Sequence, residues 1–236
     1  MLAYVRAKKK ILQYIRSEGL RAGDRLPTEI ELSEQLDISR LTLREALNAL
    51  KSEGIVHAVQ GKGTFVACEF DHIADSLNKN YSVSEMIEVA GYRPGVSSFE
   101  KKLVKADSCV AEKLRIPEGV DVLLCTRIRL ADDVPVVYSR DYLSPQLTSR
   151  FLGITDESVS LYAFIEETCN IPLGMSMTEL IPMAADAEIA QKLNVPEGSP
   201  ILKMRASVND VFGNPLVYAS ELFRPDMFKF TVSRGR

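Results

Sequence analysis

The chain has 236 residues, 46% of them hydrophobic and 26% charged, which is enough to build a hydrophobic core in each of two domains. No run of 18 or more apolar residues occurs and the N-terminal segment lacks the features of a signal peptide, so we expect a cytoplasmic protein without a membrane span. Residues 1–69 hold 11 basic against 9 acidic side chains, while the rest of the chain is acidic overall. This basic bias is too weak to identify a nucleic-acid-binding protein by itself.

Cysteine and histidine are the residue types that would signal a metal site or a disulfide framework. The four cysteines are Cys68, Cys109, Cys125 and Cys169, and no two of them have the Cys-x-x-Cys spacing of a zinc site. Only two histidines accompany them. We therefore expect free thiols in a reducing compartment, and neither a structural metal nor a cofactor.

Two short helices are predicted between residues 28 and 50. The first begins at Thr28, whose hydroxyl can cap it, while Glu31 three residues later completes a capping box. This helix ends near Leu36. A tight turn follows, in which Asp37 suits a left-handed conformation and Ser39 can cap the second helix. The apolar stripe of the second helix consists of Leu43, Ala46, Leu47 and Leu50.

The other face of the second helix is polar. Arg40, Thr42, Arg44 and Asn48 lie between the apolar positions and point away from the core. A recognition helix needs such groups, because Arg pairs with guanine edges or phosphates and Thr contacts a thymine methyl or a phosphate in the major groove. For two short helices alone, the solvated face of an ordinary helix pair is an equally good interpretation.

A β-hairpin is predicted after these helices. Residues 55–59 and 64–67 have the composition of two short strands, and Gln60-Gly61-Lys62-Gly63 joins them. The glycines permit a tight turn and a close approach of the backbone to a phosphate. The order helix, helix, hairpin predicts a winged helix-turn-helix.

The segment from Tyr4 to Ala67 resembles the DNA-binding domain of the GntR family of bacterial repressors. Four motifs carry the resemblance in order and at the family's spacing, at residues 23–29, 39–47, 53–56 and 60–66. The resemblance implies DNA contacts from the recognition helix and from the tip of the wing. The expected DNA-binding residues are Thr28, Arg40, Thr42, Arg44, Gln60, Gly61, Lys62 and Gly63.

The periodic pattern is lost after the hairpin, which predicts a domain boundary near residue 69. We expect a winged helix-turn-helix domain over residues 1–69, a linker over residues 70–80 with room for a helical turn, and a second domain over residues 81–236.

An internal repeat at an offset of 79 residues organises the second domain. Ala106-Asp107 recurs as Ala185-Asp186, and the Pro-Glu-Gly sequence at residues 117–119 recurs at residues 196–198. Each copy predicts an Asp-capped helix, a turn and then two strands. Two copies are too few for a solenoid. We expect them to share one antiparallel sheet with helices to one side and clefts at the sheet ends, which makes the fold class α+β.

The second domain resembles the effector-sensing UTRA domain of the HutC subfamily over roughly Ser82 to Phe230. Gly91-Tyr92-Arg93-Pro94, the two Pro-Glu-Gly turns and Ser160-Leu161-Tyr162 carry this resemblance. The UTRA fold is shared with chorismate lyase, so the resemblance implies an enzyme-like pocket that is used for sensing.

Two arginines identify a candidate ligand site. Arg127 and Arg129 are two residues apart on a predicted strand, so both point to one face and can hold a phosphate or a carboxylate. The alternative is a solvated outer face of the sheet. Tyr162 can line the pocket or belong to the core with the apolar residues of its helix. The resemblance implies Ser84, Ser160 and Tyr162 as further lining residues, and Tyr218 and Glu221 can contribute from the second repeat. The expected effector-binding set is therefore Ser84, Arg127, Arg129, Ser160, Tyr162, Tyr218 and Glu221.

The sequence therefore predicts a transcription regulator, most simply a repressor, that binds double-stranded operator DNA as a homodimer and responds to a small anionic metabolite such as a sugar phosphate. One alternative is an enzyme, because the second domain resembles a lyase fold, but no constellation of acid, base, nucleophile or metal ligands is present. The other alternative is a DNA-binding module without a ligand. We expect no enzymatic activity.

Overall fold

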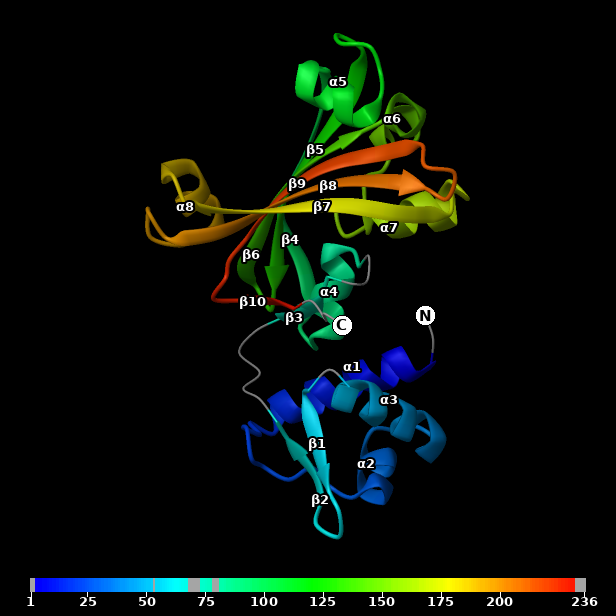
Figure 1. Ribbon diagram of the computed structural model, residues 1–236, viewed down its shortest axis with the longest axis vertical. Helices are drawn as coiled ribbons and strands as arrows, with labels where there is room; N and C mark the ends of the chain where they lie inside the picture. The colour runs from blue at the N-terminus through cyan, green and yellow to red at the C-terminus, as the bar shows by residue number, and fades with distance from the viewer. Residues whose placement is uncertain (1–2, 53, 68–72, 78–80, 232–236) are drawn as a thin grey trace, which may run out of the picture. The chain divides into compact units, whose positions relative to one another are not determined.

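The computed structural model describes residues 3–52, 54–67, 73–77 and 81–231 (Figure 1). The chain divides into two compact units. One holds the residues up to Ala74 together with Glu85–Tyr92, and the other holds Asp75–Ser84 together with the residues from Arg93 onward. Each unit has its own hydrophobic core, and the fold class is α+β, as predicted.

The first unit is a winged helix. Its elements are α1 Ala3–Ser17, α2 Glu29–Gln35, α3 Arg40–Ser52, β1 Val56–Val59 and β2 Gly63–Val66. The apolar stripe of α3 packs against α1, which contributes Ala7, Ile11 and Ile15 at a spacing of four residues. Helix α1 is not among the predicted elements. The run Lys8-Lys9-Lys10 divides its apolar positions, so that its stripe is hard to recognise in the sequence.

The predicted linker contains a strand and not a helical turn. Strand β3, Ile73–Ser76, pairs with β10, Phe228–Thr231, in a small two-stranded sheet. Ile73 is fully buried. The expectation of a helical turn is wrong for this stretch because β10, a segment far along the chain, supplies the partner for its backbone. The remaining linker residues, 68–72 and 78–80, lie outside the described part of the chain.

The second unit is built on a six-stranded antiparallel sheet in the order β4-β5-β6-β9-β8-β7. Its strands are β4 Pro94–Lys105, β5 Asp121–Ala131, β6 Val134–Leu143, β7 Leu173–Ala184, β8 Pro200–Asp210 and β9 Pro215–Phe223. The repeats meet where β6 pairs with β9. The sheet therefore has two free edges, β4 and β7, one from each repeat.

The internal repeat is present in the structure. Helix α5, Ser108–Leu114, and helix α8, Ala187–Leu193, begin in the same way. The carboxylates of Asp107 and Asp186 each accept a hydrogen bond of 2.8 Å from the backbone amide three residues later. Each copy also contains a strand before its helix, β4 or β7, which the sequence did not predict. These two strands share little sequence and lie at the edges of the sheet.

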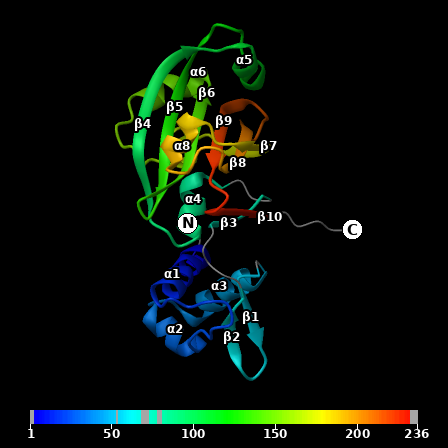
Figure 2. The same ribbon diagram turned by 90° about the vertical axis from the view of Figure 1, so that its left-hand side faces the viewer.

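Helices cover both faces of the sheet (Figures 1 and 2). Helices α5 and α8 pack on one face, as predicted. The other face, which was expected to lack helices, carries α6 Pro145–Leu152, α7 Leu161–Ala163 and a π-helical turn, Phe164–Thr168. None of the helices in the described part of the chain is long and apolar enough to span a membrane.

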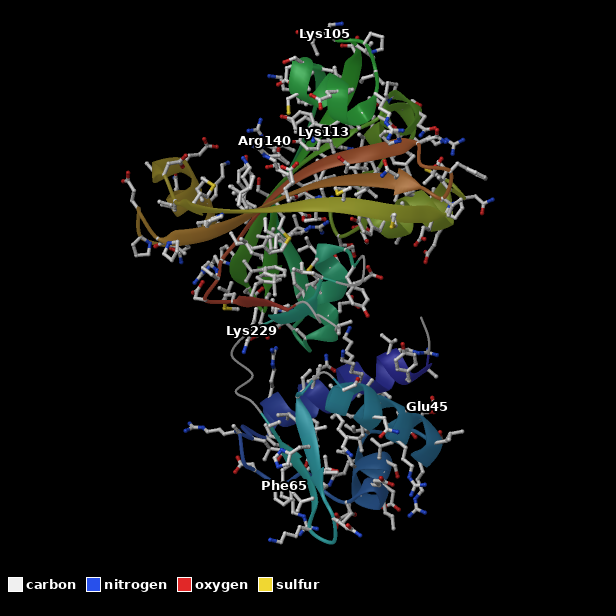
Figure 3. All side chains as sticks on the ribbon, in the orientation of Figure 1. Glu45, Phe65, Lys105, Lys113, Arg140 and Lys229 are labelled. Atoms are coloured by element: carbon white, nitrogen blue, oxygen red, sulfur yellow. The ribbon has the colours of Figure 1, made fainter. Side chains whose placement is uncertain are left out.

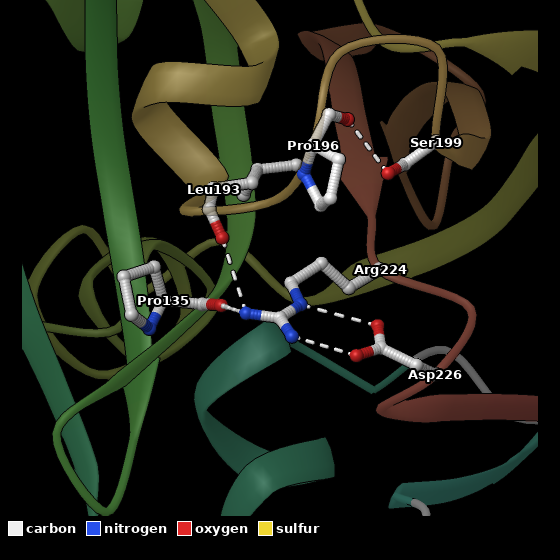
Figure 4. A network of polar contacts seen from close by, with 6 residues as sticks. All are labelled: Pro135, Leu193, Pro196, Ser199, Arg224 and Asp226. Atoms are coloured by element: carbon white, nitrogen blue, oxygen red, sulfur yellow. Dashed lines mark hydrogen bonds and ion pairs between the residues drawn. The ribbon is translucent and has the colours of Figure 1, made fainter.

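Arg224 connects the two repeats at the end of β9. Its guanidinium donates to the carbonyl oxygens of Pro135 and Leu193, at 3.2 and 3.1 Å, and forms a bidentate pair with Asp226 (Figure 4). Pro135 belongs to the first repeat and Leu193 ends the helix of the second. The same arginine therefore satisfies a terminal carbonyl of α8 and fixes the chain just before β10.

Candidate DNA-binding surface and ligand pocket

Local hydrogen bonds fix the start of α2 and the turn between α2 and α3. Thr28 Oγ1 accepts from the Glu31 amide at 3.3 Å, and Glu31 Oε2 accepts from the Thr28 amide at 2.8 Å, which completes the predicted capping box. The hydrogen bonds that the amide and the hydroxyl of Thr28 donate to the Glu31 carboxylate hold the pKa of Glu31 below its usual value. Asp37 has the expected left-handed conformation, and Ser39 Oγ accepts from the Thr42 amide at 3.2 Å at the start of α3.

Helix α3 separates an apolar face from a polar one, as its sequence predicted. The stripe from Leu43 to Leu50 is buried, whereas Arg40 and Arg44 are exposed. Arg44 Nε donates to Glu29 Oε2 at 2.6 Å. This bond uses one edge of the guanidinium, so the Nη groups can still bind another acceptor. Glu29 is a positioning residue that the sequence analysis did not identify, since no spacing rule connects it to a residue 15 positions away.

The wing is a two-stranded hairpin with a tight tip. Gly61 and Gly63 have φ values of 72° and 119°, and the Lys62 amide donates to the Val59 carbonyl at 3.0 Å. A Cβ at Gly63 would lie 2.8 Å from Nε of Arg25. Glycine at this position therefore also allows the side chain of Arg25 to lie close to the wing. Phe65, labelled in Figure 3, stacks on His57 with ring centroids 5.7 Å apart. The tip residues Gln60, Gly61 and Lys62 are exposed.

A pocket lies on one face of the sheet in the second unit. Side chains of β5, β6, β9 and β8 form its floor, and Tyr162 of α7 and residues 81–83 complete its wall. The expectation of clefts at the sheet ends is wrong for this pocket. The pairing of the strands explains its position, because Arg127 lies opposite Ser139, and Ser139 lies opposite Glu221. Polar side chains of three strands therefore meet on one face.

Both predicted arginines are buried at this pocket, with only 3% of Arg127 and 5% of Arg129 exposed. The alternative of a solvated strand face is therefore wrong. Arg127 Nη2 donates to Asp141 Oδ2 at 3.0 Å and Nη1 donates to the Val159 carbonyl at 3.1 Å. Ser139 Oγ donates to the same Asp141 oxygen at 3.2 Å. The Arg127 charge is therefore neutralised by a buried carboxylate.

Arg129 has a different environment. No ion pair within 4 Å involves it in the described part of the chain. Burial and the neighbouring Arg127 lower the pKa of Arg129 to about 9, although Asp141 and Glu221 act in the opposite direction. At neutral pH it is a buried cation with incomplete compensation. An anion in the pocket would supply the missing charge.

The structure brings together four of the seven predicted effector-binding residues, namely Arg127, Arg129, Tyr162 and Glu221. Ser160 caps α7 by accepting from the Ala163 amide at 3.4 Å, and Ser84 is buried in α4, Val83–Val89; neither belongs to the pocket lining.

Tyr218 lies on the opposite face of the sheet. There it stacks on Tyr142, with centroids 6.1 Å apart, and its oxygen is 3.8 Å from the Cys109 sulfur. Burial, with a smaller effect of Cys109, raises the pKa of Tyr218 to about 12. The pocket residues that the sequence did not identify include Asp141 and residues 81–83.

Cys109, Cys125 and Cys169 are free, and Cys68 lies outside the described residues. In the parts of the chain that the structure describes, no group of three or more His, Cys, Asp or Glu side chains could hold a metal ion.

A winged helix in one unit and a buried, cation-lined pocket in the other are the two parts of a ligand-responsive transcription regulator. Residues 3–66 match the family described as bacterial regulatory proteins, gntR family, and residues 89–229 match the UTRA domain. The chain belongs to the GntR family of regulators that carry a UTRA domain. Regulators of this kind bind operator DNA and take small-molecule effectors in the UTRA domain. They are DNA-binding proteins and not enzymes.

Named relatives agree with this assignment. The chain is 31% identical to the probable transcriptional regulator PhnF of Escherichia coli (strain K12), over 97% of this chain and 94% of the relative. It is 28% identical to the HTH-type transcriptional repressor NagR of Bacillus subtilis (strain 168), over 96% and 92% of the two chains. The crystal structure of PhnF from Mycobacterium smegmatis aligns with a TM-score of 0.64 at 26% identity and covers 92% of this chain and 95% of the other.

Proposed function

We propose that the protein is a repressor of the HutC subfamily that acts in the cytoplasm, binds a near-palindromic operator as a homodimer and changes its operator affinity when an anionic metabolite occupies the pocket. The observation that carries the proposal is Arg129, a buried cation without an ion pair in the described chain. Taking such a charge out of water is costly unless a counter-charge binds. A phosphate or carboxylate group fits, because a guanidinium pairs with either in a bidentate manner.

The pocket also indicates what the rest of the ligand carries. Glu221 and Tyr162 line the same pocket as Arg129, and the charge of Glu221 acts on Arg129. A carboxylate accepts hydrogen bonds, so hydroxyl or amine groups of a ligand suit this side. A sugar phosphate or a hydroxy acid combines the two chemistries. The charged side chains in the pocket therefore support a small, hydroxylated anion over an effector without polar groups.

The DNA-binding part of the proposal assigns contacts to Thr28, Arg40, Thr42, Arg44 and the wing tip, Gln60 to Gly63. Exposure of the two arginines on α3, with the stripe of Leu43, Ala46, Leu47 and Leu50 buried, supports base or phosphate contacts in the major groove. The left-handed glycines at the wing tip support close approach to a phosphate. A single winged helix reads few base pairs, which is why we infer a twofold-symmetric dimer.

Coupling between the pocket and DNA binding is supported by helix α4. Residues 81–83 line the pocket and lead directly into this helix. The later part of α4 and the residues after it, up to Tyr92, belong to the first unit. There Glu88 Oε2 lies 3.4 Å from Lys9 Nζ of α1, and the centroid of the Tyr92 ring lies 3.2 Å from the guanidinium carbon of Arg16, also on α1. Helix α1 in turn packs on α3. A ligand that moves residues 81–83 therefore acts on an element packed against the DNA-binding core.

The experiment that tests the proposal is a thermal-shift screen of the full chain against sugar phosphates, hydroxy acids and amino acids, followed by calorimetry with any compound that stabilises it. Arg129→Gln should remove the stabilisation, and a gel shift should then show an operator affinity that no longer depends on the ligand. Arg140→Gln on the other face of the sheet is the matched control and should respond like wild type. Unchanged ligand binding by Arg129→Gln would contradict the proposed site.

A further inference from the structure

The outer face of the wing carries a basic side chain, Arg25, that is not in the expected DNA-binding set. The segment before α2 pairs with β2, since the Leu26 amide donates to the Thr64 carbonyl at 2.9 Å and an isolated bridge places Arg25 opposite Phe65. Phe65 lies on the face turned away from the core, because the next residue, Val66, is fully buried. Arg25 therefore extends the wing by one short strand and shares the outer face of the hairpin with Phe65.

The side chain of Arg25 runs toward the tip of the wing. A Cβ at Gly63 would meet three atoms of the guanidinium group, Nε at 2.8 Å, Nη2 at 3.3 Å and Cζ at 3.4 Å. The guanidinium therefore lies against the backbone of Gly63, and a larger residue at that position would displace it. Gly63 thus allows the tight turn and also leaves space for the cation beside the tip.

The charge of Arg25 is not neutralised by a close partner. Arg25 is exposed, and its guanidinium makes no hydrogen bond or ion pair with any residue that the structure describes. The hairpin itself, residues 56–66, contains no Asp or Glu. The hydrogen bonds from Thr28 and, to a smaller extent, the charge of Arg25 hold the pKa of Glu31 below its usual value, so this carboxylate is already engaged. The guanidinium donors of Arg25 are therefore available to an external acceptor.

The shape of the tip indicates where that acceptor lies. Gly61 and Gly63 have no side chains, so the tip is little wider than its backbone. The minor groove of B-DNA is about 6 Å wide and admits such a narrow element. Strand β1 follows α3 and packs against it, so a duplex whose major groove holds α3 presents its neighbouring minor groove to the flanking wing.

A guanidinium is well suited to this groove. Minor grooves of A·T-rich DNA are narrow and have an enhanced negative potential that attracts arginine. Arginine is more weakly hydrated than lysine, so it loses less when it leaves water for a narrow groove. The A·T pairs present only acceptors there, whereas guanine adds an amino donor that opposes a cationic donor.

We propose that Arg25 enters the minor groove beside the tip of the wing and makes the protein select A·T pairs on the flank of the sequence that α3 reads. This inference rests on the operator binding of the proposed function and adds a residue and a groove to it. Arg25 would then determine specificity at base pairs that the recognition helix does not touch.

Selection from random-sequence duplexes with the full chain tests the inference first. Wild type should enrich a central sequence with A·T pairs on its flanks. Arg25→Gln should enrich the same central sequence without the A·T flanks. The matched control is Arg21→Gln, which removes an exposed arginine from the same segment but not from the wing, and it should select the same DNA as wild type.

A second measurement separates the two grooves. The selected site is prepared with A·T, G·C or inosine·cytosine flanks, because inosine lacks the minor-groove amino group of guanine but keeps its major-groove acceptors. Wild type should bind the G·C version about tenfold more weakly than the other two, the size of one lost specific contact. Arg25→Gln should bind all three versions alike. Arg25→Lys should lose most of the discrimination while its salt dependence stays that of wild type, because it keeps the charge.

Each other outcome has a definite meaning. If Arg25→Gln keeps the discrimination of wild type, Arg25 does not read the groove and the inference is overturned. If Arg25→Gln weakens binding to all three duplexes by the same factor, the contact is to a phosphate and the minor-groove assignment is overturned, while operator binding stands. If wild type enriches no sequence at all, the proposed function is overturned together with this inference.

Discussion

Arg127 Nη2 lies 3.0 Å from Asp141 Oδ2, and both side chains are almost entirely removed from solvent. The pair crosses from β5 to β6 and has Arg129 as its neighbour. A single buried carboxylate thus lies beside two buried guanidinium groups. Without a ligand, the positive charge of the two guanidinium groups therefore exceeds the negative charge of the buried carboxylate.

Asp141→Ala should destabilise the fold strongly. The change would leave Arg127 buried without its ion-pair partner, and breaking a buried pair from one side costs about 3–5 kcal/mol. Urea denaturation of the full chain measures the loss. Asp121→Ala is the control, because Asp121 pairs with Lys105 at the surface and that pair should contribute little. Equal stability of the two variants would contradict the assigned role of the buried pair.

Arg129→Met should stabilise the ligand-free protein while it abolishes ligand binding. The cation is destabilised by burial, so an apolar side chain of similar length should gain about 1–3 kcal/mol at neutral pH. Thermal melts with and without the bound anion measure both effects. A variant that is less stable than wild type would show that Arg129 already has its counter-charge.

The pH dependence of stability has a definite sign for this residue. The folded-state pKa of Arg129, about 9, lies below that of an unfolded arginine, so the unfolded chain binds more protons between the two values. Wild-type stability should gain a contribution as the pH rises above about 9, and Arg129→Met should lack it. Chemical denaturation at a series of alkaline pH values measures the difference between the two proteins.

Arg44→Ala should reduce operator affinity at a particular base pair. If the guanidinium contacts a base edge, the loss is about 1–3 kcal/mol on the operator and much smaller on scrambled DNA. Gel shifts on both DNAs measure it. Glu29→Gln is the informative companion, because it weakens the 2.6 Å bond that orients Arg44 without removing the guanidinium. Equal losses on operator and scrambled DNA would assign Arg44 to a phosphate.

Lys62→Ala should weaken binding to the operator and to scrambled DNA by about the same factor. Lys62 lies at the exposed tip of the wing and should contact a phosphate, so the slope of affinity against salt should fall by about one. Titrations at several salt concentrations provide the slope. A loss confined to the operator would instead indicate that the wing reads bases.

Local patterns made much of the fold predictable. The capping box of Thr28 and Glu31 is encoded within four residues, and so are the caps that begin α5 and α8. The repeat could be read from Asp107 and Asp186 because caps and turns depend on few residues. The two strands that precede these helices could not be predicted in this way, since edge strands are half exposed and tolerate many sequences.

Long-range contacts explain what the sequence did not reveal about the site. Arg127 and Arg129 could be placed on one face from their spacing alone. Asp141 could be connected to them only through the register of β5 against β6, which follows from the hairpin in three dimensions. Tyr218 was included in the site because the repeat suggested it, but its position in β9 directs it to the other face.

The duplication of the second unit sets the number of ligands that one chain can bind. The positions equivalent to Arg127 and Arg129 in the second copy are Ala206 and Val208, which are buried in the hydrophobic core. The two halves of the sheet thus differ on this face: the first half presents the charged side chains of Arg127 and Arg129, and the second half presents apolar side chains that pack against α7 and the π-helical turn. Calorimetry with the effector should accordingly give one molecule per chain, and a dimer should bind two that occupy sites related only by the twofold axis.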